Sequence, residues 1–258
     1  SENDTITALI EDEAEKSVIF VANAADEPPV NWNALGFDHS GWLKGTLGAG
    51  YEKSGNGRYD PLIDELLDFE SLATSSSQET IYMLTDFWVD DPSVFNLLTL
   101  KARYDDGFVA YINGIEVARE NIPGSSGELV PWDENALSNH SDNLAEQFTA
   151  VDATAGVPHL RAGTNVLAIQ ALNSGRASSD FLIWPKLEAA TVGDGPGPSA
   201  LSYGGSLKLE SSATVKARLL SSSGQWSALT EATFTVAAEA ANVNNLVISK
   251  IHYHPLEP

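Results

Sequence analysis

The sequence predicts an all-β fold, and three observations support this. From Leu98 to Arg103, apolar residues alternate with polar or charged ones, the period-two pattern of a strand with one buried face. Asn113-Gly114 lies between two apolar runs, and both residues tolerate the positive φ angles of a tight hairpin turn. Elsewhere, short apolar runs are separated by segments rich in Gly, Asn, Asp, Ser and Pro, so we expect no long helix.

The strands are expected in a simple order along the chain. Residues 5–30 contain one or two strands, with Val18 and Phe20 on one face. A long loop region follows at 31–80, interrupted by a helical turn at residues 62–67, and a second long connection is expected at 121–145. The remaining strands are predicted at residues 81–89, 98–104, 108–112, 115–119, 160–172, 181–187, 206–210, 214–219 and 232–236.

Composition limits the possible partners. With 258 residues, 43% of them hydrophobic, the chain can form one large sandwich core and a small appendage. The absence of cysteine excludes disulfides and thiol catalysis. A net charge of -22 repels phosphate backbones and anionic membranes, so we expect neither nucleic-acid binding nor membrane insertion. Solubility alone accounts for this charge, and a specific cationic partner is the alternative.

The segment from Tyr104 to Arg119 carries a family resemblance. An aromatic residue followed by Asp-Asp-Gly, an apolar strand, Asn-Gly and Glu-Val-Ala-Arg resembles the galactose-binding-like β-sandwiches of large secreted bacterial proteins, which are similar to carbohydrate-binding modules. Three further stretches resemble the same family in the same order: Trp32 to Tyr51, Leu160 to Ile169 and Ser178 to Phe181. The resemblance implies a jelly-roll β-sandwich and a secreted, extracellular location. Trp32 and Trp42 coincide with family landmarks and are expected to pack inside.

The rest of the chain suggests a modular protein. We assign residues 1–190 to the sandwich and the Gly- and Pro-rich residues 191–200 to a linker. Residues 201–238 resemble part of an immunoglobulin-like β module. Residues 239–258 are a linker and a segment that resembles the start of a lamin-tail-like domain. We therefore expect a multidomain bacterial parent protein whose neighbouring domains are partners of this one.

Paired carboxylates point to calcium as a cofactor. Calcium prefers carboxylate and carbonyl oxygens, and adjacent Asp105 and Asp106 in a tight turn can direct two side chains at one ion. A similar pair coordinates calcium in lectin domains of the PA14 type, which this segment resembles. Asp38 is a third candidate ligand. The alternative is that each Asp caps its turn by accepting a backbone N–H two residues on.

A second acidic stretch, residues 133–142, spaces oxygen donors like part of an EF-hand loop. Position 137, however, is Leu, and the closing Glu is missing. A solvated polar loop is the competing interpretation.

Sugars bind by stacking on exposed aromatic rings, which indicates candidate residues for a glycan site. Trp132 follows Pro131 in a long polar loop with no alternating pattern to bury it, although a packing role there is the alternative. Phe87 takes the inward position of its strand in the pattern of the family that this chain resembles, so the resemblance implies that Trp88 points outward. An outward Trp88 suits a ligand platform or a contact with a neighbouring module.

One short loop sequence adds further glycan candidates. Arg58, Tyr59 and Asp60 place a donor, a ring and an acceptor within three residues, a set suited to sugar hydroxyls. The alternative for Tyr59 is a plain loop anchor.

No enzymatic signature is present, since the sequence lacks a Gly-x-Ser-x-Gly elbow, a His-Glu-x-x-His motif and a phosphate-binding Gly loop. We therefore predict a non-catalytic carbohydrate-binding module that binds polysaccharide through loop aromatics on a calcium-stabilised sandwich. The alternative function is a structural spacer that orients neighbouring domains and binds no small ligand.

Overall fold

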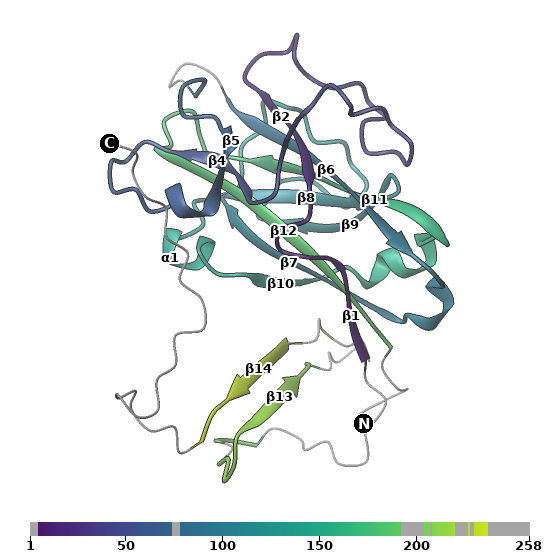
Figure 1. Ribbon diagram of the computed structural model, residues 1–258. Helices are drawn as coiled ribbons and strands as arrows, with labels where there is room; N and C mark the ends of the chain where they lie inside the picture. The colour runs from purple at the N-terminus through teal and green to yellow at the C-terminus, as the bar shows by residue number, and fades with distance from the viewer. Residues whose placement is uncertain are drawn as a thin grey trace, which may run out of the picture. The chain divides into compact units, whose positions relative to one another are not determined.

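Two mainly antiparallel sheets form a β-sandwich over residues 5–191, which confirms the all-β prediction (Figure 1). The computed structural model describes residues 5–73, 78–191, 204–206, 208–219, 227 and 230–236. The chain divides into two compact units, of which the larger holds the sandwich and the smaller holds a two-stranded hairpin.

The first sheet is organised around β12, the longest strand. β12 pairs with β7 along one edge and with β1 and β4 at different places along the other. β10 extends this sheet beyond β7, and β5 extends it beyond β4 through the sheet's one parallel pairing. The strands are β1 (Thr5–Ile10), β4 (Gly48–Glu52), β5 (Ile63–Asp68), β7 (Leu97–Asp105), β10 (Thr149–Asp152) and β12 (Asp180–Thr191).

The second sheet has the strand order β3-β2-β6-β11-β8-β9. Its two central strands, β6 and β11, pair over ten residues each. The strands are β2 (Lys16–Val21), β3 (Leu43–Gly45), β6 (Thr80–Val89), β8 (Gly107–Ile112), β9 (Ile115–Glu120) and β11 (Gly163–Leu172). Among the described residues, four short helices lie in the connections: η1 (Asp60–Leu62), η2 (Pro92–Val94), α1 (Asp142–Ala145) and η3 (Thr154–His159).

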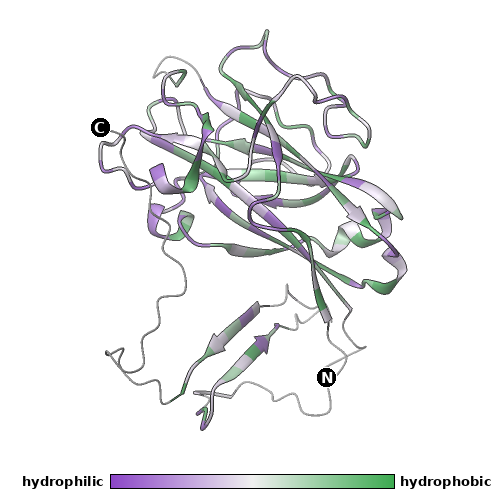
Figure 2. Cartoon of the chain, viewed as in Figure 1, coloured by the Kyte–Doolittle hydropathy of each residue, from purple (hydrophilic) through white to green (hydrophobic). Residues whose placement is uncertain are grey.

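Alternation along β6 divides its side chains between two hydrophobic clusters. Ile81, Met83 and Phe87 belong to the main core. Tyr82 and Leu84 belong to a second cluster, which includes Trp32 and the half-buried Trp42 and Trp132. Hydrophobic and hydrophilic residues alternate along several strands in Figure 2. The long connections predicted at 31–80 and 121–145 therefore supply a hydrophobic cover for the second face of this sheet.

The hairpin predicted at Asn113-Gly114 is confirmed. Asn113 has φ 51° and Gly114 has φ 87°, and β8 pairs with β9 on either side of them. Two consecutive positive φ angles give a turn whose twist matches that of the flanking strands. Before this hairpin, only Asp106 separates the end of β7 at Asp105 from the start of β8.

The helical turn predicted at residues 62–67 is wrong. The single turn η1 ends at Leu62, and residues Ile63–Asp68 form β5. A short apolar run does not distinguish a helix from a strand by its period. Pairing with β4 decided the outcome, and it buries Ile63 and Leu67 while Leu66 is exposed.

The smaller unit contains β13 (Ala213–Ala217) and β14 (Thr230–Phe234), which pair antiparallel. Two of the three strands predicted there are thus present, whereas the described residues within 206–210 are not in a strand. Residues 192–203 of the linker region and the whole segment 239–258 lie outside the described residues. In the part of the chain that is described, no helix is long and apolar enough to cross a membrane.

Candidate functional site

Three aspartates converge at one end of the sandwich. Asp105 ends β7, Asp180 begins β12 and Asp142 begins α1. One carboxylate oxygen from each lies within 4.8 Å of the other two. The strand register explains part of this cluster, because Asp105 is paired with Leu182 and Asp180 is two residues before Leu182 on the same face. α1 supplies the third carboxylate.

Asp105 is the most deeply placed member of the cluster. Its side chain is almost fully buried, and its Oδ2 accepts a hydrogen bond from the Tyr59 hydroxyl at 2.8 Å. Burial, then a hydrogen bond with Asp106 and the charge of that residue, together raise the pKa of Asp105 to about 9. The pKa of Asp180 is also raised, chiefly by burial and then by neighbouring carboxylates. Without a cation, this end of the sandwich therefore favours protonated carboxyl groups.

Arg58 neutralises the negative charge of only one member of the cluster, Asp142. Its guanidinium donates to Asp142 Oδ2 at 3.1 Å and also to the side chains of Glu146 and Asn143. Among the described residues, no lysine or arginine forms an ion pair with Asp105 or Asp180. A fourth carboxylate lies close by, because Glu52 is paired with Asp180 across β4 and β12. Glu52 is buried, and its Oε2 has no hydrogen-bond partner within the described part of the chain.

The oxygen spacing suits a hard divalent cation. Calcium binds oxygen at roughly 2.3–2.6 Å, so two ligands of one ion lie at most about 5 Å apart. The three aspartates meet this condition, and each supplies the anionic oxygen that calcium prefers. Asp105, Asp142 and Asp180 are therefore the residues that could hold a metal ion.

Asp106, predicted as a ligand beside Asp105, has a different position. Its Oδ1 accepts the backbone N–H of His140 and its Oδ2 accepts that of Ser174, both at 2.7 Å. Both carboxylate oxygens are thus used within the protein, and Asp106 is buried. Asp106 fastens two loops beside the cluster, and it is not among the three converging oxygens.

Asp38 caps a turn, which is the alternative role that we gave for it. It is exposed, and its Oδ1 accepts the backbone N–H of Ser40 at 3.0 Å. Hydrogen bonds from Ser40 lower the pKa of Asp38. In the described part of the chain, Asp38 belongs to no group of converging ligands, so its assignment to a metal site is corrected.

The predicted sugar-binding set Arg58, Tyr59 and Asp60 does not form a binding surface. Tyr59 is completely buried in a small cluster with Ile63, Ala145 and Leu182, so no face of its ring is open to a sugar. Arg58 is occupied by Asp142 and its neighbours, and only Asp60 is fully exposed. Tyr59 is a loop anchor, the alternative given for it, and it also donates to Asp105.

Trp132 packs onto the second hydrophobic cluster and is only half-exposed. Its backbone carbonyl also accepts a hydrogen bond from the Thr80 hydroxyl, which ties the loop to β6. The packing alternative for Trp132 therefore describes it better than a free stacking platform. The local sequence gave no sign of this contact because the partner residues come from other strands.

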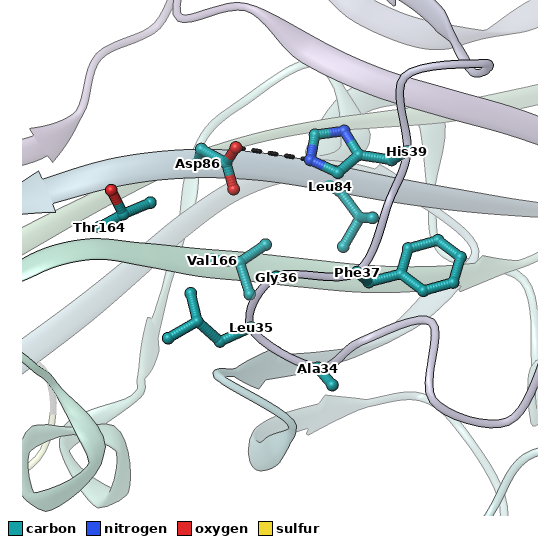
Figure 3. A pocket seen from close by; sticks show the side chains of 9 residues that line it. All are labelled: Ala34, Leu35, Gly36, Phe37, His39, Leu84, Asp86, Thr164 and Val166. Carbon is teal, nitrogen blue, oxygen red and sulfur yellow. Dashed lines mark ion pairs between the residues drawn. The ribbon is translucent and has the colours of Figure 1, made fainter.

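Trp88 points outward as predicted, with 65% of its surface exposed, while Phe87 is buried. Asp86, two residues before it on β6, and Thr164, its partner on β11, line a hollow on the outer face of these two strands. Figure 3 shows His39, on the loop that crosses this face, directed at Asp86 of β6. The distance between His39 Nε2 and Asp86 Oδ2 is 3.4 Å.

Several residues of these two regions were not identified as site residues from the sequence. Asp142 appeared only as part of an incomplete EF-hand-like spacing, and Asp180 only within a family motif. His39 has no other histidine near it in the sequence. Each lies in a polar segment without a distinctive local signal, and only the fold brings it to its partners.

Comparisons with known proteins leave the family open. No family model and no curated protein matches the chain. Among solved structures, the chain is similar to a Bacteroides uniformis beta-glucuronidase at 14% identity and a TM-score of 0.42, covering 72% of this chain and 18% of that one. It is also similar to a Ruminococcus gnavus beta-glucuronidase in complex with uronic isofagomine, at 12% identity and a TM-score of 0.41, covering 95% and 40%.

A third solved structure is a calcium-binding mutant of Bacteroides uniformis beta-glucuronidase 2, at 11% identity and a TM-score of 0.38, covering 70% of this chain and 18% of that one. The chain thus spans less than a fifth of the first of these enzymes. Similarities of this size carry no argument about function, which has to be argued from the residues themselves.

Proposed function

We propose that the chain is a non-catalytic carbohydrate-binding region of a secreted, multidomain bacterial protein, with calcium held by Asp105, Asp142 and Asp180. The observation that carries the calcium part is the convergence of three carboxylate oxygens within 4.8 Å at the loop end of the sandwich. The glycan part is supported by the exposed Trp88 and by the resemblance of four ordered motifs to galactose-binding-like sandwiches.

Calcium accounts for an otherwise unfavourable arrangement. Buried carboxylates of like charge raise one another's pKa, and this is the direction found for Asp105 and Asp180. A divalent cation between them would replace protons as the neutralising charge. It would also connect β7, β12 and α1, which are far apart in the sequence.

A catalytic use of the same carboxylates is less well supported. A raised pKa beside a second carboxylate is also a property of glycosidase active sites. Asp105, however, is only 4% exposed and Tyr59 covers its Oδ2, so its carboxyl group offers little access to a substrate. We therefore retain a non-catalytic function as the proposal.

Thermal unfolding with calcium, magnesium or a chelator tests the metal. An ion that binds only the folded state stabilises it by about 2.7 kcal/mol at a hundredfold excess over Kd. We expect calcium to raise the melting temperature, and magnesium to do so less because it requires a tighter octahedral shell. Melting curves that are identical in calcium and in chelator would remove calcium from the proposal.

A broad panel of polysaccharides tests glycan binding, and it also tests the structural spacer. Binding to any member, measured by calorimetry in the presence of calcium, supports the carbohydrate-binding function. Complete absence of binding by a folded, calcium-loaded protein would favour the spacer. The exposure of Trp88 does not separate the two functions, because an outward ring suits a ligand platform as well as a contact with a neighbouring module.

A further inference from the structure

The exposed indole of Trp88 lies on the outer face of the second sheet, next to Asp86 and Thr164, two residues that line a hollow there. Trp88 is two residues after Asp86 on β6 and is paired with Thr164 on β11, while Asp86 is paired with Val166. Side chains at these positions lie on one face because successive residues of a strand alternate. The ring, the carboxylate and the hydroxyl-bearing side chain are therefore neighbours on a single surface.

The hollow has an apolar floor and a polar rim. Leu84 and Val166 form the floor from the two central strands, and Leu35 contributes from the loop that crosses the sheet (Figure 3). His39, Asp86 and Thr164 bring polar groups to the same hollow. Its volume of about 310 Å³ is at the lower end of the range for small-molecule sites.

The groups around the hollow are held in place before any ligand arrives. Trp88 Nε1 donates to Asp90 Oδ1 at 2.7 Å, which orients the indole. An added Cβ at Gly163 would lie 3.7 Å from the ring, so the indole rests beside the backbone of β11. His39 is oriented by Asp86 and by an edge contact with Trp42. Such preorganisation lowers the entropy lost when a ligand binds.

Polar side chains around the hollow can still form hydrogen bonds with a ligand. The side chain of Asp86 is 54% exposed beyond its contact with His39, and Thr164 is exposed on the strand beside it. A ligand with hydroxyl groups can therefore find both acceptors and donors around an aromatic surface.

The surroundings of Trp88 favour a small ligand over a protein surface. Its neighbours on the outer face are Asp86 and Thr164, both polar and exposed, so the ring is not part of a broad apolar patch. A sugar ring combines an apolar C–H face with hydroxyl groups at its edge, which matches an isolated indole beside a polar hollow. Asp86 and Asp90, in a chain of net charge -22, disfavour sugars that carry carboxylate or sulfate groups.

We propose that this hollow, together with Trp88 beside it, binds one uncharged sugar residue of a glycan, with Trp88 as the stacking platform and Asp86 and Thr164 as hydrogen-bonding groups. This inference rests on the carbohydrate-binding function proposed above and names the site and the class of sugar. It differs from the loop platform first expected at Trp132 and from the acidic cluster at Asp105.

The test combines a glycan panel with variants of the whole chain. The panel contains neutral β-glucans, mannans and galactans together with a polyuronate and a sulfated galactan. We expect the wild type to bind a neutral glycan, and Trp88→Ala to weaken that binding by about tenfold or more, as expected for loss of a central aromatic contact. Trp88→Phe keeps a ring and should retain more of the affinity. Leu66→Ala, an exposed apolar side chain on β5 of the other sheet, is the matched control and should bind like the wild type.

The possible outcomes separate this inference from the broader proposal. If the wild type binds a glycan and Trp88→Ala binds it equally well, this site is wrong while the carbohydrate-binding function stands. If the folded wild type binds nothing in the panel, both the site and the carbohydrate-binding function are wrong. Preference for the polyuronate or the sulfated galactan would contradict the proposal that the bound sugar is uncharged.

A measurement on the wild type covers the case in which Trp88→Ala does not fold. The indole N–H resonance of Trp88 is assigned as the one missing from Trp88→Phe. It should shift when the neutral glycan is added, and an unchanged resonance at saturating glycan would contradict the site.

Discussion

Tyr59 and Asp105, which are 46 residues apart in the sequence, are joined by a hydrogen bond of 2.8 Å from the phenol hydroxyl to Asp105 Oδ2. Both side chains are buried. The bond connects the loop before β5 to the end of β7 and fixes one oxygen of the acidic cluster. It also explains why a tyrosine in a Gly-rich loop is unavailable to a sugar.

Asp105→Asn should separate metal binding from folding. The amide has the shape of the carboxyl group and carries no charge, so it resembles the protonated Asp105 that burial favours. We expect the variant to melt near the wild type in chelator at pH 7 and to show no stabilisation by calcium. Asp133→Asn, which changes an exposed aspartate, should keep the calcium effect. A calcium-dependent melting shift that survives in Asp105→Asn would exclude Asp105 as a ligand.

The stability of the metal-free protein should fall as pH rises from about 5 to 8. Asp105 has a pKa of about 9 in the folded state against an ordinary value of 3.8, so in this window the folded state binds more protons than the unfolded state. The free energy of unfolding therefore decreases with increasing pH. The window ends near pH 8 because burial lowers the pKa of Lys16 to about 8 in the folded state. Above that pH the folded state loses this proton before the unfolded state does, which increases the free energy of unfolding.

Denaturant titrations of metal-free wild type and Asp105→Asn across this range isolate the effect. The variant should have the flatter pH dependence. Calcium binding should become tighter over the same range, since the ion displaces the proton on Asp105. Equal pH slopes for the two proteins would contradict the role given to Asp105.

Tyr59→Phe should destabilise the fold without creating a large cavity. It removes the donor to Asp105 and leaves a buried carboxyl oxygen without its partner, which costs about 1–3 kcal/mol. Tyr82→Phe is a suitable control, because that buried ring has no hydroxyl hydrogen bond among the described residues. Equal unfolding free energies for the two variants would indicate that the Tyr59 bond contributes nothing.

Gly50→Ala should prevent stable folding. A Cβ at this position of β4 would lie 1.8 Å from the backbone oxygen of Phe181 on β12, and neither strand can move without breaking the pairing. We expect a loss of at least about 4 kcal/mol, seen as insoluble protein or a lost unfolding transition. Gly41→Ala has no neighbour within 4 Å of the added Cβ and should be tolerated. A normally folded Gly50→Ala protein would show that β4 and β12 are further apart.

Local sequence was sufficient for much of the fold. The apolar run at 81–89 predicted a strand, and Asn113-Gly114 predicted the β8–β9 turn. The family resemblance predicted the opposite orientations of Phe87 and Trp88 within that strand. These features depend on residues that are adjacent or two apart. The period of a strand and the φ preference of a turn residue act within that range.

The sites were harder to predict because they depend on contacts between distant segments. The sequence by itself determined an all-β sandwich, an aspartate pair at the β7–β8 turn and an outward Trp88. Only the tertiary structure decided that Asp142 and Asp180 join Asp105, whereas Asp106 accepts hydrogen bonds from loop N–H groups. It also decided that Trp132 packs onto the second hydrophobic cluster and that His39 approaches Asp86. The physical reason is that strand order and register bring together residues tens of positions apart, whereas local patterns specify only which face of a strand each residue takes.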